Sequence, residues 1–178
     1  MRFNEYGFLE PGEYPLTFSE LRNSILVTGE GDPSWPWNRR WRSKLVDNLE
    51  ICVRQLWACG VEEIWIDGSF CTDKYRPGDI DGYFIPPDPA EVFNGRLAER
   101  LNRLDPYRCW GWDKYRLDAY GNLQLEMWHR YRVELFPHCV GVYSGIADEH
   151  GNNMKFDEFF RRDRDLSVPK GIVRLVKG

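Results

Sequence analysis

Residues 66–81 read Ile-Asp-Gly-Ser-Phe-Cys-Thr-Asp-Lys-Tyr-Arg-Pro-Gly-Asp-Ile-Asp, and this stretch decides the fold. A run of strand-forming residues, 61–67, leads into its Gly-Ser turn, and a second such run, 79–85, follows it. Gly68 lacks a Cβ, so backbone amides can approach an anion closely there, and the neighbouring Ser69 hydroxyl can donate to a phosphate oxygen. The stretch therefore predicts two strands joined through a turn that suits phosphate.

Two carboxylates stand at the start of the second strand. Asp79 and Asp81 are two residues apart, so on a strand they point to the same face, about 7 Å from each other. Carboxylate oxygens are hard ligands that suit Mg²⁺, or Mn²⁺, and the phosphates of a substrate complete the coordination of such an ion. Asp79 and Asp81 are therefore predicted metal ligands.

The combination resembles the hallmark of the nucleotidyltransferase superfamily, which includes polymerase-β-like, antibiotic-adenylylating and minimal antitoxin-type enzymes. In this sequence Gly68-Ser69 is followed, after nine residues, by Asp79-Ile80-Asp81. The resemblance implies a third acidic residue on a later strand. It maps to Glu134 within Arg132-Val133-Glu134-Leu135, and less closely to Asp118 or Glu126.

Further segments resemble a small bacterial and phage family of nucleotidyltransferase-like proteins, a likeness that brings little known function with it. These segments are 67–72, 79–82 and the C-terminal stretch from Phe159-Phe160 to Pro169-Lys170-Gly171-Ile172-Val173. They extend the resemblance over much of the chain.

The resemblance implies a metal-dependent enzyme that moves a nucleoside monophosphate from a nucleoside triphosphate to a hydroxyl of a protein, an RNA or a small molecule. A toxin–antitoxin or phage-defence setting is consistent with it. Asp79 and Asp81 would hold Mg²⁺, and Glu134 would hold a second ion or deprotonate the acceptor hydroxyl.

Five residues are candidate nucleotide contacts. Gly68 and Ser69 would hold the β- and γ-phosphates, as the resemblance implies. Lys74 and Arg76 lie in the loop between the two strands, and Lys170 precedes the last predicted strand. Each of these three cations could contact phosphate or could simply be solvated.

Two positions depart from the superfamily pattern. Asp67 stands where an apolar residue is usual, and Gly82 stands where a hydrophobic residue commonly follows the second aspartate. Asp67 could crowd the metal site with an extra carboxylate or could cap the turn. Asp67 and the shortness of the chain keep open an alternative function, a catalytically inactive binding module that serves as an antitoxin or regulatory subunit for a protein partner.

The whole sequence predicts one α+β domain over residues 1–178, with an irregular N-terminal arm over about 1–17. A capping box, Thr17-x-x-Glu20, predicts a helix start, and Asn38 and Gly60 suit the two ends of a long amphipathic helix. The predicted helices are 18–26, 38–60, 88–104 and 156–164; the strands are 61–67, 79–85, 131–136 and 171–176; a loop covers 29–36. Residues 105–130 are ambiguous: Gly111 and Gly121-Asn122 indicate turns, and residues 123–129 could form either a strand or a helix.

Composition limits the partners. The net charge is −4, so the chain lacks the positive field that holds a long nucleic acid. The basic cluster Arg39-Arg40-Trp41-Arg42 resembles a nucleic-acid groove in composition, but it is more typical of a solvated helix face.

Cysteine usage and hydropathy predict a cytoplasmic protein with no membrane partner. The five cysteines are scattered, without the close Cys and His pairs of a zinc site, and therefore read as reduced thiols. The N-terminus lacks the apolar run of a signal peptide, and no stretch has the length of a membrane span.

Overall fold

The computed structural model describes residues 1–31, 36–163 and 168–178. Its elements are, in chain order, β1 (Glu13–Leu16), α1 (Phe18–Asn23), α2 (Ile25–Thr28), α3 (Arg39–Ala58), β2 (Ile64–Asp67), a 3₁₀ turn (Gly68–Cys71), β3 (Ile80–Phe84), α4 (Pro89–Phe93), α5 (Arg96–Leu104), β4 (Tyr115–Leu117), β5 (Leu123–Leu125), α6 (Glu126–Tyr131), β6 (Val133–Pro137), α7 (Phe156–Phe160) and β7 (Ile172–Leu175).

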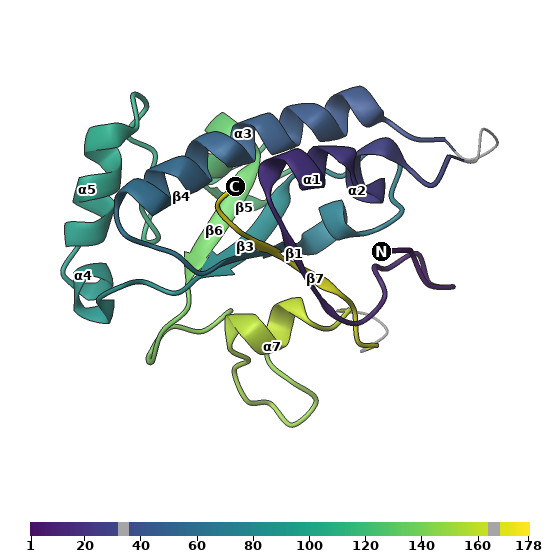
Figure 1. Ribbon diagram of the computed structural model, residues 1–178. Coiled ribbons are helices and arrows are strands. Elements are labelled where there is room, and N and C mark those ends of the chain that lie inside the picture. The colour runs from purple at the N-terminus through teal and green to yellow at the C-terminus, as the bar shows by residue number, and fades with distance from the viewer. Residues whose placement is uncertain (32–35, 164–167) are drawn as a thin grey trace.

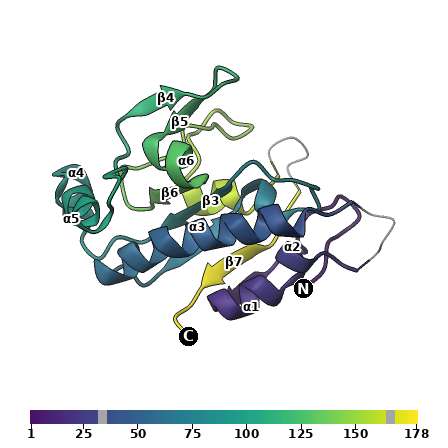
Figure 2. The ribbon, with the colours of Figure 1, turned by 90° about the horizontal axis from the view of Figure 1, so that it is seen from above.

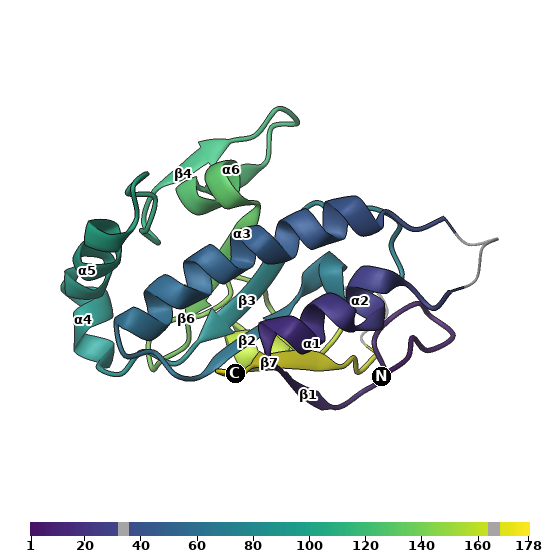
Figure 3. The ribbon, with the colours of Figure 1, turned by 45° about the horizontal axis from the view of Figure 1, so that its top comes forward.

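Five strands form a mixed sheet in the order β1-β7-β2-β3-β6. β1 pairs with β7 and β3 pairs with β6 in parallel, whereas β2 runs antiparallel to both β7 and β3. Figure 3 shows these strands beneath the long helix α3. The sheet and its helices form a single domain, which confirms the predicted α+β class.

Helices cover the sheet on both sides, with α3 on one and α7 on the other (Figure 1). The α3 side holds the main core, in which Leu45, Leu49 and Val53 of the helix belong to one buried cluster with Ile66 and Leu135 of the sheet. Each such side chain contributes about 1.5–3 kcal/mol on full burial. The predicted caps of this helix are confirmed, because the Asn38 side chain accepts from a backbone N–H of the first turn and Gly60, with φ +84°, follows its end.

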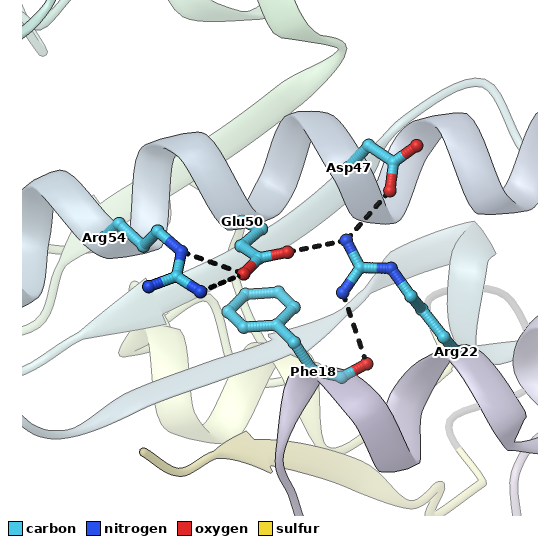
Figure 4. Close-up of polar contacts among 5 residues, drawn as sticks. All are labelled: Phe18, Arg22, Asp47, Glu50 and Arg54. Carbon is cyan, nitrogen blue, oxygen red and sulfur yellow. Dashed lines mark hydrogen bonds and ion pairs between the residues drawn. The ribbon is translucent and has the colours of Figure 1, made fainter. Parts of the chain in front are cut away.

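A surface network ties α1 to α3 (Figure 4). The Arg22 guanidinium donates to Asp47 at 2.8 Å and to one oxygen of Glu50 at 2.6 Å, while Arg54 donates through Nε to the other oxygen of Glu50 at 2.8 Å. Partly exposed pairs of this kind contribute about 0.5 kcal/mol each. The network therefore mainly fixes the direction of α1, whose Phe18 is buried against the core.

The helix predicted over 18–26 is two short helices. Its capping box is confirmed, because the Thr17 hydroxyl accepts from the backbone N–H of Glu20 at 3.2 Å while the Glu20 carboxylate accepts from the backbone N–H of Thr17 at 2.8 Å. Ser24 then interrupts the helix in an extended conformation, with its hydroxyl bonded to the Leu21 carbonyl at 2.8 Å. The chain restarts as α2.

Several other boundaries differ from the predicted ones. The helix predicted over 88–104 divides into α4 and α5 at Gly95, which adopts a left-handed conformation with φ +77°. Strand β2 begins at Ile64 rather than at residue 61, and β6 begins at Val133 because Tyr131 belongs to α6. Helix α7 ends at Phe160. Residues 32–35 of the predicted 29–36 loop, and residue 164, lie outside the described residues.

The predicted irregular arm contains a strand, which corrects that prediction for its C-terminal part. Within the part of the chain that the structure describes, β1 pairs with β7 alone, at the edge of the sheet, where Pro15 lies opposite Arg174. Proline is tolerated on edge strands because one side of the strand needs no ladder bond. The preceding part of the arm is anchored by Leu9, which is fully buried.

Residues 105–130 combine both structures that the sequence left open. β4 and β5 form a two-stranded antiparallel hairpin, and α6 follows β5 directly. In Figure 2 this unit lies on the opposite side of α3 from α1 and α2. Two residues of this unit, Trp128 of α6 and Leu125 of β5, donate hydrogen bonds to the carboxylates of Asp79 and Glu134 near β3 and β6.

All five cysteines are free, as predicted, and four of them are buried. Among the described residues, no helix combines the length and the apolar character that crossing a bilayer requires.

Candidate active site

Three carboxylates form a row across three neighbouring strands. Asp67 lies opposite Asp81 in the antiparallel pair β2–β3, and Asp81 lies opposite Glu134 in the parallel pair β3–β6. Register partners on adjacent strands point to the same face of a sheet, so we refer to these residues as the acidic row. Like charges opposite one another destabilise a sheet. The row is therefore an arrangement that packing alone does not explain.

A second row on the same face is aromatic. It lies two residues before Asp67 in β2 and two residues after Asp81 and Glu134 in β3 and β6. The row consists of Trp65, Tyr83 and Phe136, with Trp65 opposite Tyr83 and Tyr83 opposite Phe136. Helix α7 packs on it, with the rings of Phe156 and Phe136 stacked at 4.8 Å and those of Phe160 and Tyr83 at 6.0 Å. This face is thus divided into an apolar half beneath α7 and a polar half that contains the acidic row.

Asp79 joins the polar half from the residue that precedes β3. Its Oδ2 accepts a hydrogen bond of 2.6 Å from the indole N–H of Trp128 in α6. Burial raises the pKa of Asp79, and the Trp128 hydrogen bond and the charges of Lys74 and Arg132 offset this only in part. Both predicted aspartates therefore lie at this end of β3.

Glu134 occupies the third position of the acidic row. Its Oε1 accepts a hydrogen bond of 2.7 Å from the backbone N–H of Leu125, which ends the β4–β5 hairpin. Burial raises the pKa of Glu134 to about 7; the Leu125 bond opposes this shift and the charge of Asp79 adds to it. The carboxyl group can therefore exchange a proton near neutral pH.

The two alternatives for the third carboxylate lie elsewhere. Asp118 is engaged in the β4–β5 turn, where it accepts from the backbone N–H groups of Tyr120 and Asn122. Glu126 is exposed and pairs with Arg116 at 3.0 Å. The geometry therefore favours Glu134.

Asp67 is fully buried, and its Oδ2 lies 2.7 Å from the ammonium nitrogen of Lys170, just before β7. Burial raises the pKa of Asp67 to about 7 against the lowering effect of Lys170. A hydrogen bond to the backbone N–H of Gly68, the first residue of the 3₁₀ turn Gly68–Cys71, also lowers the pKa of Asp67. Asp67 thus contacts the turn and lies opposite Asp81, so both interpretations of this residue, as an extra carboxylate and as a cap of the turn, remain predictions.

Two glycines are required by close approach. Gly68 has φ +70°, and a Cβ there would overlap Oδ2 of Asp81, so the turn lies directly against that carboxylate. At Gly82 a Cβ would overlap the carbonyl oxygen of Trp65 on the paired strand. The glycine at position 82, where the superfamily pattern has a hydrophobic residue, is therefore explained by the close packing of β2 and β3.

The acidic residues fit a hard divalent cation by donor type and by charge. Burial, with the charges of Asp79 and Glu134, raises the pKa of Asp81 well above its usual range. Such crowding of carboxylates is relieved by a bound cation, and the donors offered are all oxygens, as Mg²⁺ prefers. In the ranges that the structure describes, no three carboxylate, histidine or cysteine side chains are already drawn together as a metal site. The Asp79 and Glu134 carboxylates face the Trp128 and Leu125 donors instead.

The predicted phosphate contacts Gly68 and Ser69 form the start of the 3₁₀ turn against Asp81. Ser69 is half-buried, and its carbonyl oxygen accepts from the Thr72 hydroxyl at 2.8 Å. The turn therefore stands where an anion bound beside the acidic row would meet it.

The three predicted cations differ in their surroundings. Lys74 is exposed and close enough to Asp79 to lower its pKa. Arg76 is exposed and places its guanidinium 4.4 Å from the centre of the Trp41 ring. Lys170 is committed to the ion pair of the acidic row described above.

A buried arginine, which sequence reasoning assigned to a solvated helix face, anchors the site loop. Arg42 is fully buried, and that assignment is therefore wrong for this residue. Its guanidinium donates to the carbonyl oxygens of Leu26, Phe70, Thr72 and Lys74 at 2.5–2.8 Å. Burial lowers the pKa of Arg42 to about 10. The loop between the 3₁₀ turn and Asp79 is thus fastened to α3.

A cavity of about 360 Å³ lies beside α7. It is lined by Ile146, Ala147, Asp148, Glu149, His150, Met154, Glu158, Phe159, Arg162 and Asp163. Its carboxylates outnumber its cations, which disfavours a polyphosphate as its ligand. The charge of Asp163 adds to the raised pKa of Asp67, so the cavity and the acidic row lie within electrostatic range of each other.

Comparison with known proteins gives one match. A family model described as a family of unknown function, DUF6932, matches residues 1–176, almost the entire chain. The chain belongs to this family. No curated protein and no solved structure gives a significant match. Membership of DUF6932 adds no activity, so a function must be argued from the site itself.

Proposed function

We propose that this DUF6932 protein is a metal-dependent nucleotidyltransferase, which moves a nucleoside monophosphate from a nucleoside triphosphate to a hydroxyl of a protein, an RNA or a small molecule. The observation that carries the proposal is the register of β3 and β6, which sets Asp81 opposite Glu134 with Asp79 at the entry to β3. A Gly-Ser turn lies against the same carboxylates. The carboxylates and the Gly-Ser turn therefore lie at one place, which supports the proposal.

Asp79 and Asp81 would hold Mg²⁺ or Mn²⁺, which supplies neutralisation of the phosphate charge when bound. Gly68 and Ser69 would orient the β- and γ-phosphates. Glu134 would take the proton from the acceptor hydroxyl, a role that suits it because burial raises its pKa to about 7. The acceptor oxygen then forms a bond to the α-phosphorus while the bond from that phosphorus to the departing pyrophosphate breaks.

The test uses nucleoside triphosphates labelled at the α-phosphate, incubated with the purified protein, Mg²⁺ and a cell extract. We expect label on a macromolecule or small molecule from the α-labelled nucleotide and none from the γ-labelled one. Asp81→Asn and Glu134→Gln should abolish labelling. Glu126→Gln is the matched control, because Glu126 pairs with Arg116 at the surface. Undiminished labelling by both site variants would contradict the proposal.

One observation favours the alternative, a binding module without turnover that acts on a protein partner as an antitoxin or regulatory subunit. The Lys170 ammonium beside Asp67 already supplies a positive charge at the acidic row. A protein that retains a specific partner in a pulldown, and gives no label with any of the four nucleotides, would support the module. A toxin–antitoxin or phage-defence setting suits either function.

A further inference from the structure

We propose that Arg132 binds the phosphates of the nucleotide at this site, an inference that rests on the proposed function. The residue lies between α6 and β6, and its carbonyl oxygen accepts from the backbone N–H of Ile80 at 3.0 Å, between Asp79 and Asp81 in the sequence. Its charge lowers the pKa of Asp79 against the larger effect of burial. Arg132 is thus a cation held at the polar half of the face.

The backbone of Arg132 is strained in a way that glycine would relieve. Arg132 has φ +57° at the C-terminal cap of α6, where the left-handed conformation favours glycine. Among the described residues, the only other non-glycine residue with a positive φ is Arg108, at +52°. An arginine at a glycine position indicates that its side chain has a use.

The side chain is held in place but leaves its donors available. The guanidinium carbon lies 3.7 Å from the centre of the Trp128 ring, and the indole N–H of the same tryptophan donates to Asp79. Stacking of this kind fixes the plane of a guanidinium and leaves its N–H groups at the edge. Within residues 1–31, 36–163 and 168–178, this guanidinium has no hydrogen bond and no ion pair. A planar fork of N–H donors matches the oxygens of a phosphate.

Of the other cations near the site, Lys74 also lies close enough to Asp79 to lower its pKa but is exposed, and the remaining three are placed differently. Lys170 is bound to Asp67, and both terminal nitrogens of Arg42 donate to backbone carbonyl oxygens. Arg76 stacks on Trp41, farther along the loop. Arg132 therefore combines an ordered guanidinium, available donors and a position beside Asp79.

The experiment measures the binding of inorganic tripolyphosphate with Mg²⁺ by calorimetry. For Arg132→Gly we expect an affinity about ten-fold to a hundred-fold lower than that of the wild type, the loss that corresponds to charge-assisted hydrogen bonds. Arg132→Lys retains the positive charge but lacks the planar set of N–H donors, so its affinity should lie between those of the wild type and Arg132→Gly. Arg108→Gly is the matched control, because it removes an arginine that also has a positive φ; its affinity should stay within about two-fold.

Thermal unfolding of the two glycine variants checks that both are folded, and relief of the positive φ should leave each at least as stable as the wild type. Unchanged binding by Arg132→Gly, an equal loss in Arg108→Gly, or no binding of tripolyphosphate by the wild-type protein would overturn the inference.

The α-label assay, run in parallel, separates this inference from the proposed function. Transfer of label with unaltered tripolyphosphate binding in Arg132→Gly would refute the role of Arg132 and leave the transferase standing. Binding that depends on Arg132, without any transfer of label, would support Arg132 and refute the transferase.

Discussion

The ammonium group of Lys170 lies 2.7 Å from the carboxylate of Asp67, and the two side chains are 11% and 0% exposed. Lys170 comes from the segment that precedes β7, whereas Asp67 ends β2. The pair therefore joins the start of β7 to the acidic row. An ion pair so deeply buried is costly to break from one side, because the remaining charge has neither water nor a partner.

Replacement of Lys170 by methionine should lower the free energy of unfolding by about 3 kcal/mol, since it leaves Asp67 buried without its cation. Urea denaturation at pH 7 measures the loss. The double variant Asp67→Asn/Lys170→Met should recover part of it. Lys177→Met is the control, because Lys177 pairs with Glu62 at the surface and should change little. If the loss in the double variant equals the sum of the losses in Asp67→Asn and Lys170→Met, the two residues are not coupled.

Replacement of Gly82 by alanine should destabilise the sheet by roughly 3 kcal/mol, as expected for overpacking in a rigid environment. The added Cβ would overlap the carbonyl oxygen of Trp65 and lie 3.1 Å from the Cα of Ile66, neither of which can move without distorting the β2–β3 pair. Gly78→Ala is the control, since a Cβ at Gly78 meets nothing within 4 Å. Thermal unfolding compares the two; an equal effect would refute the packing explanation.

Replacement of Arg42 by methionine should lower the free energy of unfolding by about 3 kcal/mol, because it leaves carbonyl oxygens of α2 and of the 70–74 segment without their donor. It should also speed hydrogen exchange in residues 70–74, whose carbonyl groups Arg42 holds. Mass-spectrometric exchange measures this effect locally. Arg40→Met, on the exposed side of the same helix, should leave both properties unchanged. Normal protection of 70–74 in Arg42→Met would show that the loop is fastened by other contacts.

The strands on either side of the 66–81 stretch could be predicted because their signals are local. Strand-forming runs, a Gly-Ser turn and the spacing of Asp79 and Asp81 all fall within a few residues. The order of the strands could not be predicted in the same way. It depends on β7 inserting between β1 and β2, a pairing of distant segments that no local pattern specifies.

The burial of Arg42 was indicated by its helical spacing, but the basic residues around it pointed to a solvent-exposed face. Arg42 lies three and seven residues before Leu45 and Leu49, so it shares their buried helical face. The charge cluster around it suggested solvent instead. A long cationic side chain can occupy such a face when backbone carbonyl groups satisfy it, and those carbonyl groups come from loops that are distant in sequence.

Arg132 could not be found from its sequence context, because its role depends on where α6 ends. Gly121-Asn122 indicates a turn, but the residues after it favour strand and helix about equally. Only the three-dimensional arrangement shows that Arg132 caps a helix, stacks on Trp128 and lies beside Asp79. The assignment of Glu134 as the third carboxylate stays a prediction, which its place in the acidic row supports.

Asp105 should make stability depend on pH in the acid range. It is 2% exposed and accepts hydrogen bonds from the Cys109 backbone N–H at 2.9 Å and from the Tyr131 hydroxyl at 2.7 Å. Burial raises the pKa of Asp105, but these bonds outweigh it and hold the pKa below its usual range. The folded state therefore binds a proton less readily than the unfolded chain. The stabilisation is complete above the unfolded pKa of about 3.9 and is lost as the pH falls through the folded value.

Replacement of Asp105 by asparagine should lower stability by about 2 kcal/mol at pH 7, and the difference from the wild type should shrink at about pH 3. Urea denaturation at both pH values measures it. Tyr131→Phe removes one of the donors and should shift the acid limb of the wild-type curve toward higher pH. A difference that is constant from pH 7 to pH 3 would contradict the assignment.

The insertion of β7 between β1 and β2 also has a consequence for biosynthesis. While the ribosome is still translating residues 172–175, β1 has no partner, and one edge of β2, with its apolar Ile64, Trp65 and Ile66, is open. An open apolar edge recruits other chains, so the nascent protein is exposed to aggregation until residues 172–175 have been added. Of the five strands of the sheet, β7 comes last in chain order, so truncation just before residue 172 should yield inclusion bodies rather than a shortened native domain.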